Sequence, residues 1–160
     1  MIEHLEKFIE KKSAELYPFA YALVPDDLQA SQLIIDAVEL LLVDSNLSPR
    51  LVSYYQNSQT LSSEQKLITD NLLSHIYRIS KKRAIQLNGS YIIPKGFGAF
   101  YQTPMDRRAV VFLREKFSFS WERIAMIIGE DKVVAIQNYH LGIDSIHDFM
   151  GRPVEIISAK

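Results

Sequence analysis

Residues 119–129 read FSWERIAMIIG, and this stretch decides the fold that the sequence predicts. Ser120 is a favoured helix N-cap, and Gly129 suits the left-handed residue that often ends a helix. Ile124 and Ala125 fall where a short helix faces inward. A small residue such as Ala125 in the first helix of a helix-turn-helix lets the second helix cross closely. The stretch therefore predicts a helix-turn-helix whose recognition helix covers residues 132–139.

Helical patterns flank this motif on both sides. Before it, Thr103 is placed to cap a helix that has Pro104 at its first helical position. After it, a further helix follows, and Gly142 either ends that helix or lies within it. We predict a helix-turn-helix domain over residues 103–143 and a C-terminal extension over residues 144–160.

The N-terminal part carries apolar residues at helical spacing in three segments. The first covers residues 2–16, and Pro18 is expected to interrupt it. The second covers residues 28–43 and is apolar on more than one face, and the third covers residues 62–87. We predict a single helical domain over residues 1–87.

Residues 88–102 are the predicted linker between the two domains. They hold three of the six glycines of the chain, together with several aromatic side chains. A linker this aromatic is expected to pack on another part of the chain. Because no series of strands is recognisable, the sequence predicts an all-α protein with two small helical domains.

Composition limits the possible functions. The 160 residues carry a net charge of −1 and no cysteine, which excludes disulfides, thiolate metal sites and cysteine catalysis. Residues 1–60 carry four basic and nine acidic side chains, whereas residues 61–100 carry six basic and two acidic ones. The start lacks the pattern of a signal peptide, and no apolar run is long enough for a membrane span, so we expect a cytoplasmic protein with no membrane contact.

The sequence contains no recognisable catalytic motif. Phosphate-binding loops, zinc-protease motifs and the nucleophile elbow are missing, so we expect no enzyme activity and no cofactor. His140, Asp144 and His147 have a spacing that suits a metal, but we interpret them as a polar helix face and expect no metal site. Asp26 and Asp27 are interpreted as helix caps.

Three segments share a pattern with one known family. Residues 30–38 read ASQLIIDAV, residues 77–85 read YRISKKRAI, and the third segment is residues 119–129. In this order they resemble the docking helix, the end of region two and region four of bacterial RNA polymerase sigma factors. The small two-domain extracytoplasmic-function class is the most similar. The resemblance spans about residues 17–140.

This resemblance implies partners and roles. It implies that the docking helix binds RNA polymerase core, with Gln32, Leu33 and Asp36 at the contact. It also implies that the end of region two captures and melts promoter DNA, while region four reads a more distant promoter element in the major groove. An anti-sigma factor or another regulatory protein is a possible further partner.

Candidate nucleic-acid-binding residues lie in two places. Basic side chains neutralise phosphates, an aromatic ring can stack on an unpaired base, and amides can read base edges. On these grounds the candidates are Tyr77, Arg78, Lys81, Lys82 and Arg83 in the first place, and Lys132, Gln137 and Asn138 in the second. The alternative for the first group is a solvated basic helix end that complements the helix dipole.

The chain also departs from the family pattern. Gln29, Ser31 and Gln32 stand where the docking helix of the family is acidic. Positions of the recognition helix that are usually basic are here Ile136, Asn138, Leu141 and Ile143. The three apolar residues among them either contact a partner protein or pack under the C-terminal extension.

Two functions follow from these features. The first is a sigma-factor-like transcription regulator that binds RNA polymerase core and contributes to promoter recognition. The alternative is a sigma-like fold repurposed as a protein–protein interaction regulator with weak or no DNA binding.

Overall fold

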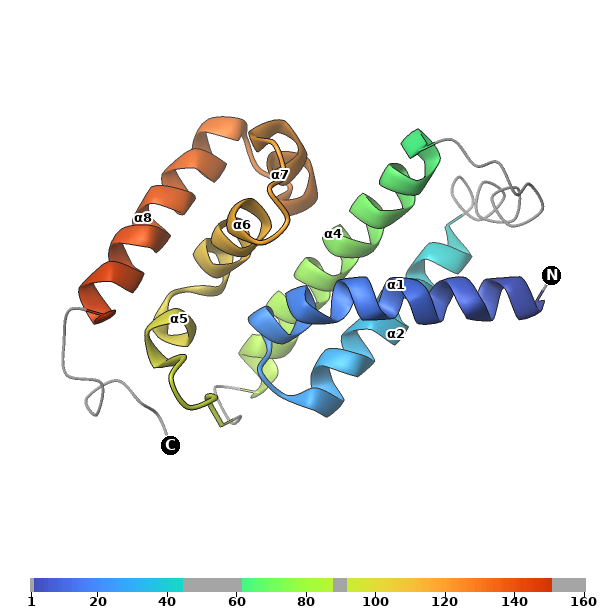
Figure 1. Cartoon of the computed structure of the whole chain (residues 1–160), viewed down its shortest axis with the longest axis horizontal. Coiled ribbons are helices and arrows are strands. Elements are labelled where there is room, and N and C mark those ends of the chain that lie inside the picture. The colour runs from blue at the N-terminus through green and yellow to red at the C-terminus, as the bar shows by residue number, and fades with distance from the viewer. Residues whose placement is uncertain (1, 45–61, 88–91, 151–160) are drawn as a thin grey trace.

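The computed structural model describes residues 2–44, 62–87 and 92–150, and within these ranges the chain is all-helical, as predicted. The helices and their bounds are α1 (Ile2–Leu23), α2 (Asp27–Val43), α4 (Ser62–Leu87), α5 (Gly98–Gln102), α6 (Met105–Glu115), α7 (Trp121–Ile128) and α8 (Lys132–Met150). Figure 1 shows α1, α2 and α4 packed together on one side and α6, α7 and α8 on the other.

Helix α1 is longer than predicted, because it continues through Pro18 to Leu23. The predicted interruption at Pro18 is therefore wrong. A proline inside a helix removes one backbone hydrogen bond and usually kinks or breaks the helix. Here the following turn is apolar, and its residues Phe19 and Leu23 are completely buried. Burial of these side chains offsets the loss at Pro18.

Helix α8 is also longer than the predicted recognition helix, because Gly142 lies inside it. Gly142 is buried against α6, and a Cβ atom built on it would lie 2.7 Å from Cγ2 of Val111 and 3.3 Å from Cβ of Arg107. The missing side chain thus permits a close approach of α8 to α6. The predicted boundary between residues 143 and 144 falls within this continuous helix.

Replacing Gly142 with alanine is expected to destabilise the protein by about 1–3 kcal/mol, because the new methyl group would force α8 away from Val111. This effect should exceed the gain of about 1 kcal/mol that alanine brings to a helix interior. Urea denaturation followed by circular dichroism would measure the change. The exposed neighbour His140, replaced with alanine, is the control and should change stability by less than about 0.5 kcal/mol.

The described part of the predicted linker packs on the rest of the protein. It contains the short helix α5, and the hydroxyl of Tyr101 donates to the carbonyl oxygen of Tyr21 at 2.8 Å. Thr103 does not cap α6 as predicted. It ends α5, where its Oγ1 donates to the carbonyl oxygen of Ala99 at 3.1 Å. Residues 88–91 of the linker lie outside the described residues.

The two predicted domains share one cluster of buried side chains. Helix α1 packs on α6, and α4 packs on α7. Phe19 of α1 and Phe112 of α6 lie with their ring centroids 5.8 Å apart. The carboxylate of Asp70 on α4 accepts a hydrogen bond from Nε of Arg123 on α7 at 2.7 Å. Both apolar packing and an ion pair therefore hold the halves together.

Arg108 on α6 forms a further link between the halves and is only 5% exposed. Its Nε and Nη2 atoms donate to the carbonyl oxygens of Ala22 and Leu23 at 3.2 and 2.8 Å. Carbonyls at the end of a helix have no partner within that helix, so Arg108 satisfies the end of α1. Its Nη1 atom donates to the carbonyl oxygens of Tyr101 and Thr103 at 3.2 and 2.6 Å.

Candidate nucleic-acid and partner-binding surfaces

Helix α2 presents an apolar stripe to solvent. Leu28, Ile35 and Leu42 are 83%, 50% and 38% exposed. Their spacing of seven residues places them on one helix face, because seven residues complete almost two turns. The opposite face is core, with buried side chains at Ala30, Leu33, Ile34, Ala37, Val38 and Leu41. Exposed apolar side chains in line along a helix are typical anchors for a protein partner.

The start of α2 is fixed by local bonds. Asp26 is the N-cap, as its sequence position predicts, and its carboxylate accepts a hydrogen bond from the backbone N–H of Gln29 at 3.0 Å. The hydroxyl of Tyr17 on α1 donates to the carboxylate of Asp27. This bond raises the pKa of Tyr17 to about 12, because it stabilises the protonated phenol. The stripe is thus carried by a helix anchored to α1.

The predicted docking residues divide between surface and core. Gln32 is exposed beside the stripe, and its Nε2 donates to Asp36 at 2.9 Å. Leu33 is completely buried, so its predicted place at the partner contact is wrong. It falls on the core face because it lies two residues before Ile35 on a helix with a 100° turn per residue. Sequence analysis missed the exposed stripe residues, although their spacing of seven residues was visible.

The basic end of α4 contributes three exposed cations: Arg78, Lys81 and Lys82. Arg78 lies back on its own helix, where its Nη2 donates to Oγ of Ser74 at 3.2 Å. The same Nη2 lies 3.5 Å from Nδ1 of His75. Burial, followed by the charge of Arg78, lowers the pKa of His75. Lys81 and Lys82 are therefore the members of this group best placed for phosphate contacts.

Arg83 and Asp36 form an ion pair that joins α4 to α2. The sequence assigned Arg83 to nucleic acid and Asp36 to polymerase, and the structure brings these two side chains together. Because the two charges neutralise each other, Arg83 attracts phosphate less strongly and Asp36 attracts a basic partner less strongly. The pair also joins the basic end of α4 to α2.

Tyr77 is buried, with 3% exposure, so its predicted role of stacking on an unpaired base is not compatible with this structure. Burial, with smaller effects of Asp106 and Glu130, raises the pKa of Tyr77 to about 12. The Nζ of Lys81 lies 5.4 Å from the centroid of the Tyr77 ring, within the range of a cation–π contact. The buried Tyr77 ring therefore contacts the exposed Lys81 side chain of the same helix.

Helices α7 and α8 have the predicted local features. Ser120 caps α7 by accepting a hydrogen bond from the backbone N–H of Arg123 at 3.2 Å. Gly129 ends α7 with φ of +77°, and the N–H of Glu130 returns to the carbonyl oxygen of Ala125 at 3.1 Å. Both predictions, the Ser120 cap and the left-handed glycine, are confirmed.

The predicted recognition residues on α8 carry little free charge. Lys132 donates to Oε1 of Glu122 at 2.7 Å, and this pair lies at the surface. The bond to Lys132 lowers the pKa of Glu122. Gln137 is exposed and Asn138 is half-buried. This face therefore offers amide groups but little net positive charge to DNA.

Several apolar side chains of α7 and α8 are also exposed. Met126, Val133 and Leu141 are 63%, 64% and 46% exposed. Ile136 and Ile143, for which the sequence leaves open a partner contact or packing under the C-terminal extension, are half-buried. Residues 151–160 lie outside the described residues, so packing of these side chains under the end of the chain stays a prediction.

Comparison of the chain with protein-family models, with curated proteins and with solved structures finds no match. Within the described residues, no group of three or more histidine, aspartate or glutamate side chains is arranged to hold a metal ion. The side chain of His147, part of the spacing considered above, lies outside those residues. No helix in the described part of the chain is long and apolar enough to cross a membrane.

Proposed function

We propose that this chain is a sigma-factor-like transcription regulator that binds RNA polymerase core through the exposed face of α2. The observation that carries the proposal is the stripe of Leu28, Ile35 and Leu42. The sequence resemblance assigns polymerase docking to this same helix. Where the family is acidic the chain has neutral residues, so the apolar stripe would supply the contact energy that charge supplies in the family.

The proposed contribution to promoter DNA comes from the basic end of α4. Lys81 and Lys82 are exposed there, one helix away from the docking face. The pairing of α4 with α2 through Arg83 and Asp36 means that a polymerase bound at α2 would lie close to DNA held at α4. Free in solution, two lysines give weak and salt-sensitive DNA binding, whereas the polymerase complex adds their contacts to its own.

Replacing Ile35 with glutamate is expected to weaken binding to purified RNA polymerase core by about tenfold or more. The complex would then bury a carboxylate without a partner at the interface. Retention on immobilised core polymerase, quantified over a concentration series, measures this. Met126, which is 63% exposed on α7, is replaced with glutamate as the matched control and should leave binding unchanged. Failure of the unaltered chain to bind, or equal binding of both variants, would contradict the proposal.

The DNA contribution has a separate test on the polymerase complex. Replacing Lys81 and Lys82 with glutamine is expected to make the slope of log K for promoter binding against log salt concentration less negative by about two. Each lost phosphate contact removes the release of about one counterion. A filter-binding titration over a salt series measures the slope. An unchanged slope in the double variant would remove α4 from the DNA interface.

A second candidate function is a protein–protein interaction regulator with weak or no DNA binding. The observation that favours it is the surface of α7 and α8, where Met126, Val133 and Leu141 are exposed and Lys132 is paired with Glu122. A recognition helix without free cations lacks most of the non-specific attraction to DNA. Under this alternative the protein would not bind core polymerase and would bind promoter DNA weakly or not at all.

A further inference from the structure

A mostly apolar pocket of about 490 Å³ lies between α1, α5, α6 and α8. Its volume is within the range of small-molecule sites. Each of the four helices contributes a large side chain to its walls, and these are Tyr21, Phe100, Phe112 and Ile146. A molecule bound in this pocket would therefore contact both halves of the protein and the short helix between them.

The walls of this pocket suit a hydrocarbon. The hydroxyl of Tyr101, which also lines it, is already bonded to the carbonyl oxygen of Tyr21 at 2.8 Å. Phe97, just before α5, lines the pocket as well and is 58% exposed, so its ring presents apolar surface to water. A ligand that covers such surface gains free energy, because apolar area is removed from water.

The aromatic rings of the pocket already pack on one another or on the core. The Phe112 ring lies with its centroid 5.8 Å from that of Phe19 and 5.2 Å from that of Phe117. The Phe100 ring packs edge-on against Tyr101 at 5.1 Å. These rings offer apolar contact without an open stacking face, and an aliphatic chain needs only such contact.

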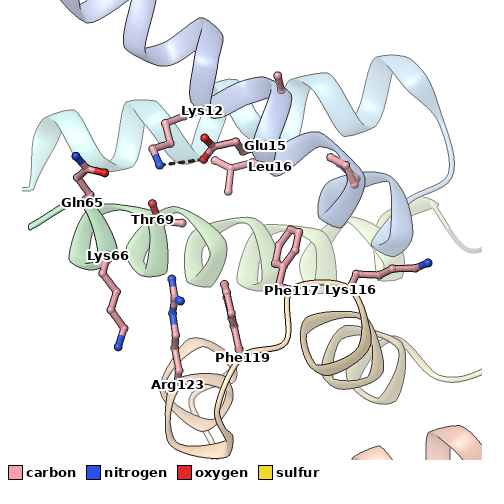
Figure 2. A pocket seen from close by; sticks show the side chains of 12 residues that line it. Lys12, Glu15, Leu16, Gln65, Lys66, Thr69, Lys116, Phe117, Phe119 and Arg123 are labelled. Carbon is pink, nitrogen blue, oxygen red and sulfur yellow. Dashed lines mark hydrogen bonds and ion pairs between the residues drawn. The ribbon is translucent and has the colours of Figure 1, made fainter. Parts of the chain in front are cut away.

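A single cation borders the pocket. Lys116 is the only charged side chain among the described residues that line it. Lys116 is exposed, and no ion pair among the described residues includes it. It also lines a larger pocket of about 730 Å³, where its side chain extends away from Phe117 and Phe119 (Figure 2). Lys116 is thus the cation that the smaller pocket offers to a ligand, and its exposure places it at the edge.

We propose that this pocket binds a medium-chain fatty acid, a molecule with one unbranched aliphatic chain and one carboxylate. The chain would lie against Tyr21, Phe100 and Phe112, and the carboxylate would pair with Lys116 at the edge. A neutral hydrocarbon would leave Lys116 unpaired. A ligand with several polar groups would bury them against walls that offer few partners.

The test is a titration of the full, isotope-labelled chain with octanoate, followed by nuclear magnetic resonance. Backbone amide signals of Tyr21, Ala99, Phe100 and Ile146 are expected to shift together, because these residues line the pocket. From hexanoate through octanoate to decanoate, the affinity should rise by about fourfold for each added CH₂ group. Absence of these shifts, or an affinity that does not depend on chain length, would overturn the proposal.

The role of the cation has its own test. Replacing Lys116 with glutamine should weaken binding of octanoate by about fivefold, because the carboxylate loses its ion pair at a partly exposed site. Binding of 1-octanol, which has the same chain without the charge, should not change. Lys66→Gln is the matched control, since Lys66 is an exposed lysine that lines only the larger pocket. Equal weakening in both variants would assign octanoate to the larger pocket and refute the proposal.

Two further variants test the apolar walls. Ala99→Leu adds a larger side chain to the pocket and should weaken octanoate and 1-octanol alike, by about tenfold or more. Phe97→Ala removes an exposed ring, leaves the core untouched and should weaken both ligands by about threefold or more. Circular dichroism checks that each variant is folded. Unchanged binding of octanoate to Phe97→Ala, or to folded Ala99→Leu, would place the ligand elsewhere.

Binding should also be visible in thermal unfolding. Octanoate is expected to raise the melting temperature of the unaltered chain, because it binds surfaces that come together only in the folded protein. The increase should be smaller for Lys116→Gln than for Lys66→Gln. A melting temperature that octanoate leaves unchanged or lowers would contradict a site formed by the folded chain.

Discussion

Replacing Arg108 with methionine is expected to lower the free energy of unfolding by about 3–5 kcal/mol, because buried carbonyl oxygens would lose their donor. The side chain is 5% exposed and donates to the carbonyls of Ala22, Leu23, Tyr101 and Thr103. Methionine fills a similar volume but donates nothing. Since a domain of this kind is stable by only about 5–15 kcal/mol, the variant would lose much of its stability.

Urea denaturation monitored by circular dichroism measures this loss. Replacing Arg108 with lysine should recover only part of it, because one ammonium group cannot reach carbonyls on both sides of a guanidinium fork. Replacing the exposed Arg78 with methionine is the control, and its effect should stay below about 0.5 kcal/mol. A similar small effect for Arg108 would show that its hydrogen bonds do not support the junction between the halves.

Replacing Arg123 with methionine is expected to cost about 2–4 kcal/mol at neutral pH, because the buried carboxylate of Asp70 would lose its ion-pair partner. Asp70 is only 6% exposed, and its Oδ1 accepts from Nε of Arg123 at 2.7 Å. The variant Asp70→Asn should cost less than about 1 kcal/mol, since the amide oxygen still accepts that bond without charge. Equal losses in both variants would contradict this account.

The same pair predicts a pH dependence with a definite sign. Burial raises the pKa of Asp70, and this effect outweighs the opposing effect of Arg123. The folded protein therefore holds a proton on Asp70 more readily than the unfolded chain does. The contribution of this group to the free energy of unfolding falls as pH rises from the usual aspartate pKa through the raised one.

Comparison of the unaltered chain with Asp70→Asn isolates this contribution. Between about pH 7 and pH 3.5, the free energy of unfolding of the unaltered chain should rise relative to that of Asp70→Asn as the pH falls, because folding favours the protonated form of Asp70. A fall in the free energy of unfolding of the unaltered chain relative to Asp70→Asn toward acidic pH would mean that the pKa of Asp70 is lowered on folding.

Sequence periodicity predicted most helices, but it wrongly interrupted the first at Pro18 and left open whether the last continues through Gly142. The caps at Asp26 and Ser120 and the glycine at the end of α7 are local signals, and all three are found where predicted. Pro18 and Gly142 are local signals for interruption, yet both lie inside helices. In each case packing against another helix outweighs the local preference, and periodicity within one segment contains no information about that partner.

On the candidate surfaces too, local spacing predicts some features and tertiary packing decides the others. The apolar stripe on α2 follows from spacing alone, and so does the burial of Leu33 on the opposite face. The pairing of Arg83 with Asp36 joins residues 47 positions apart, and no pattern in the sequence indicates it. Tyr77 stands in a basic stretch that suggested exposure, but its ring lies in the core.

The sequence by itself determined the all-α class, the caps, and the neutral composition of the last helix, because these depend on residue type and on neighbours within one or two turns. The tertiary structure alone decided which charges remain available and where the halves meet. Arg108 and Arg123 form bonds between distant segments. Such contacts depend on how helices pack, and packing is a property of the whole chain rather than of any stretch of it.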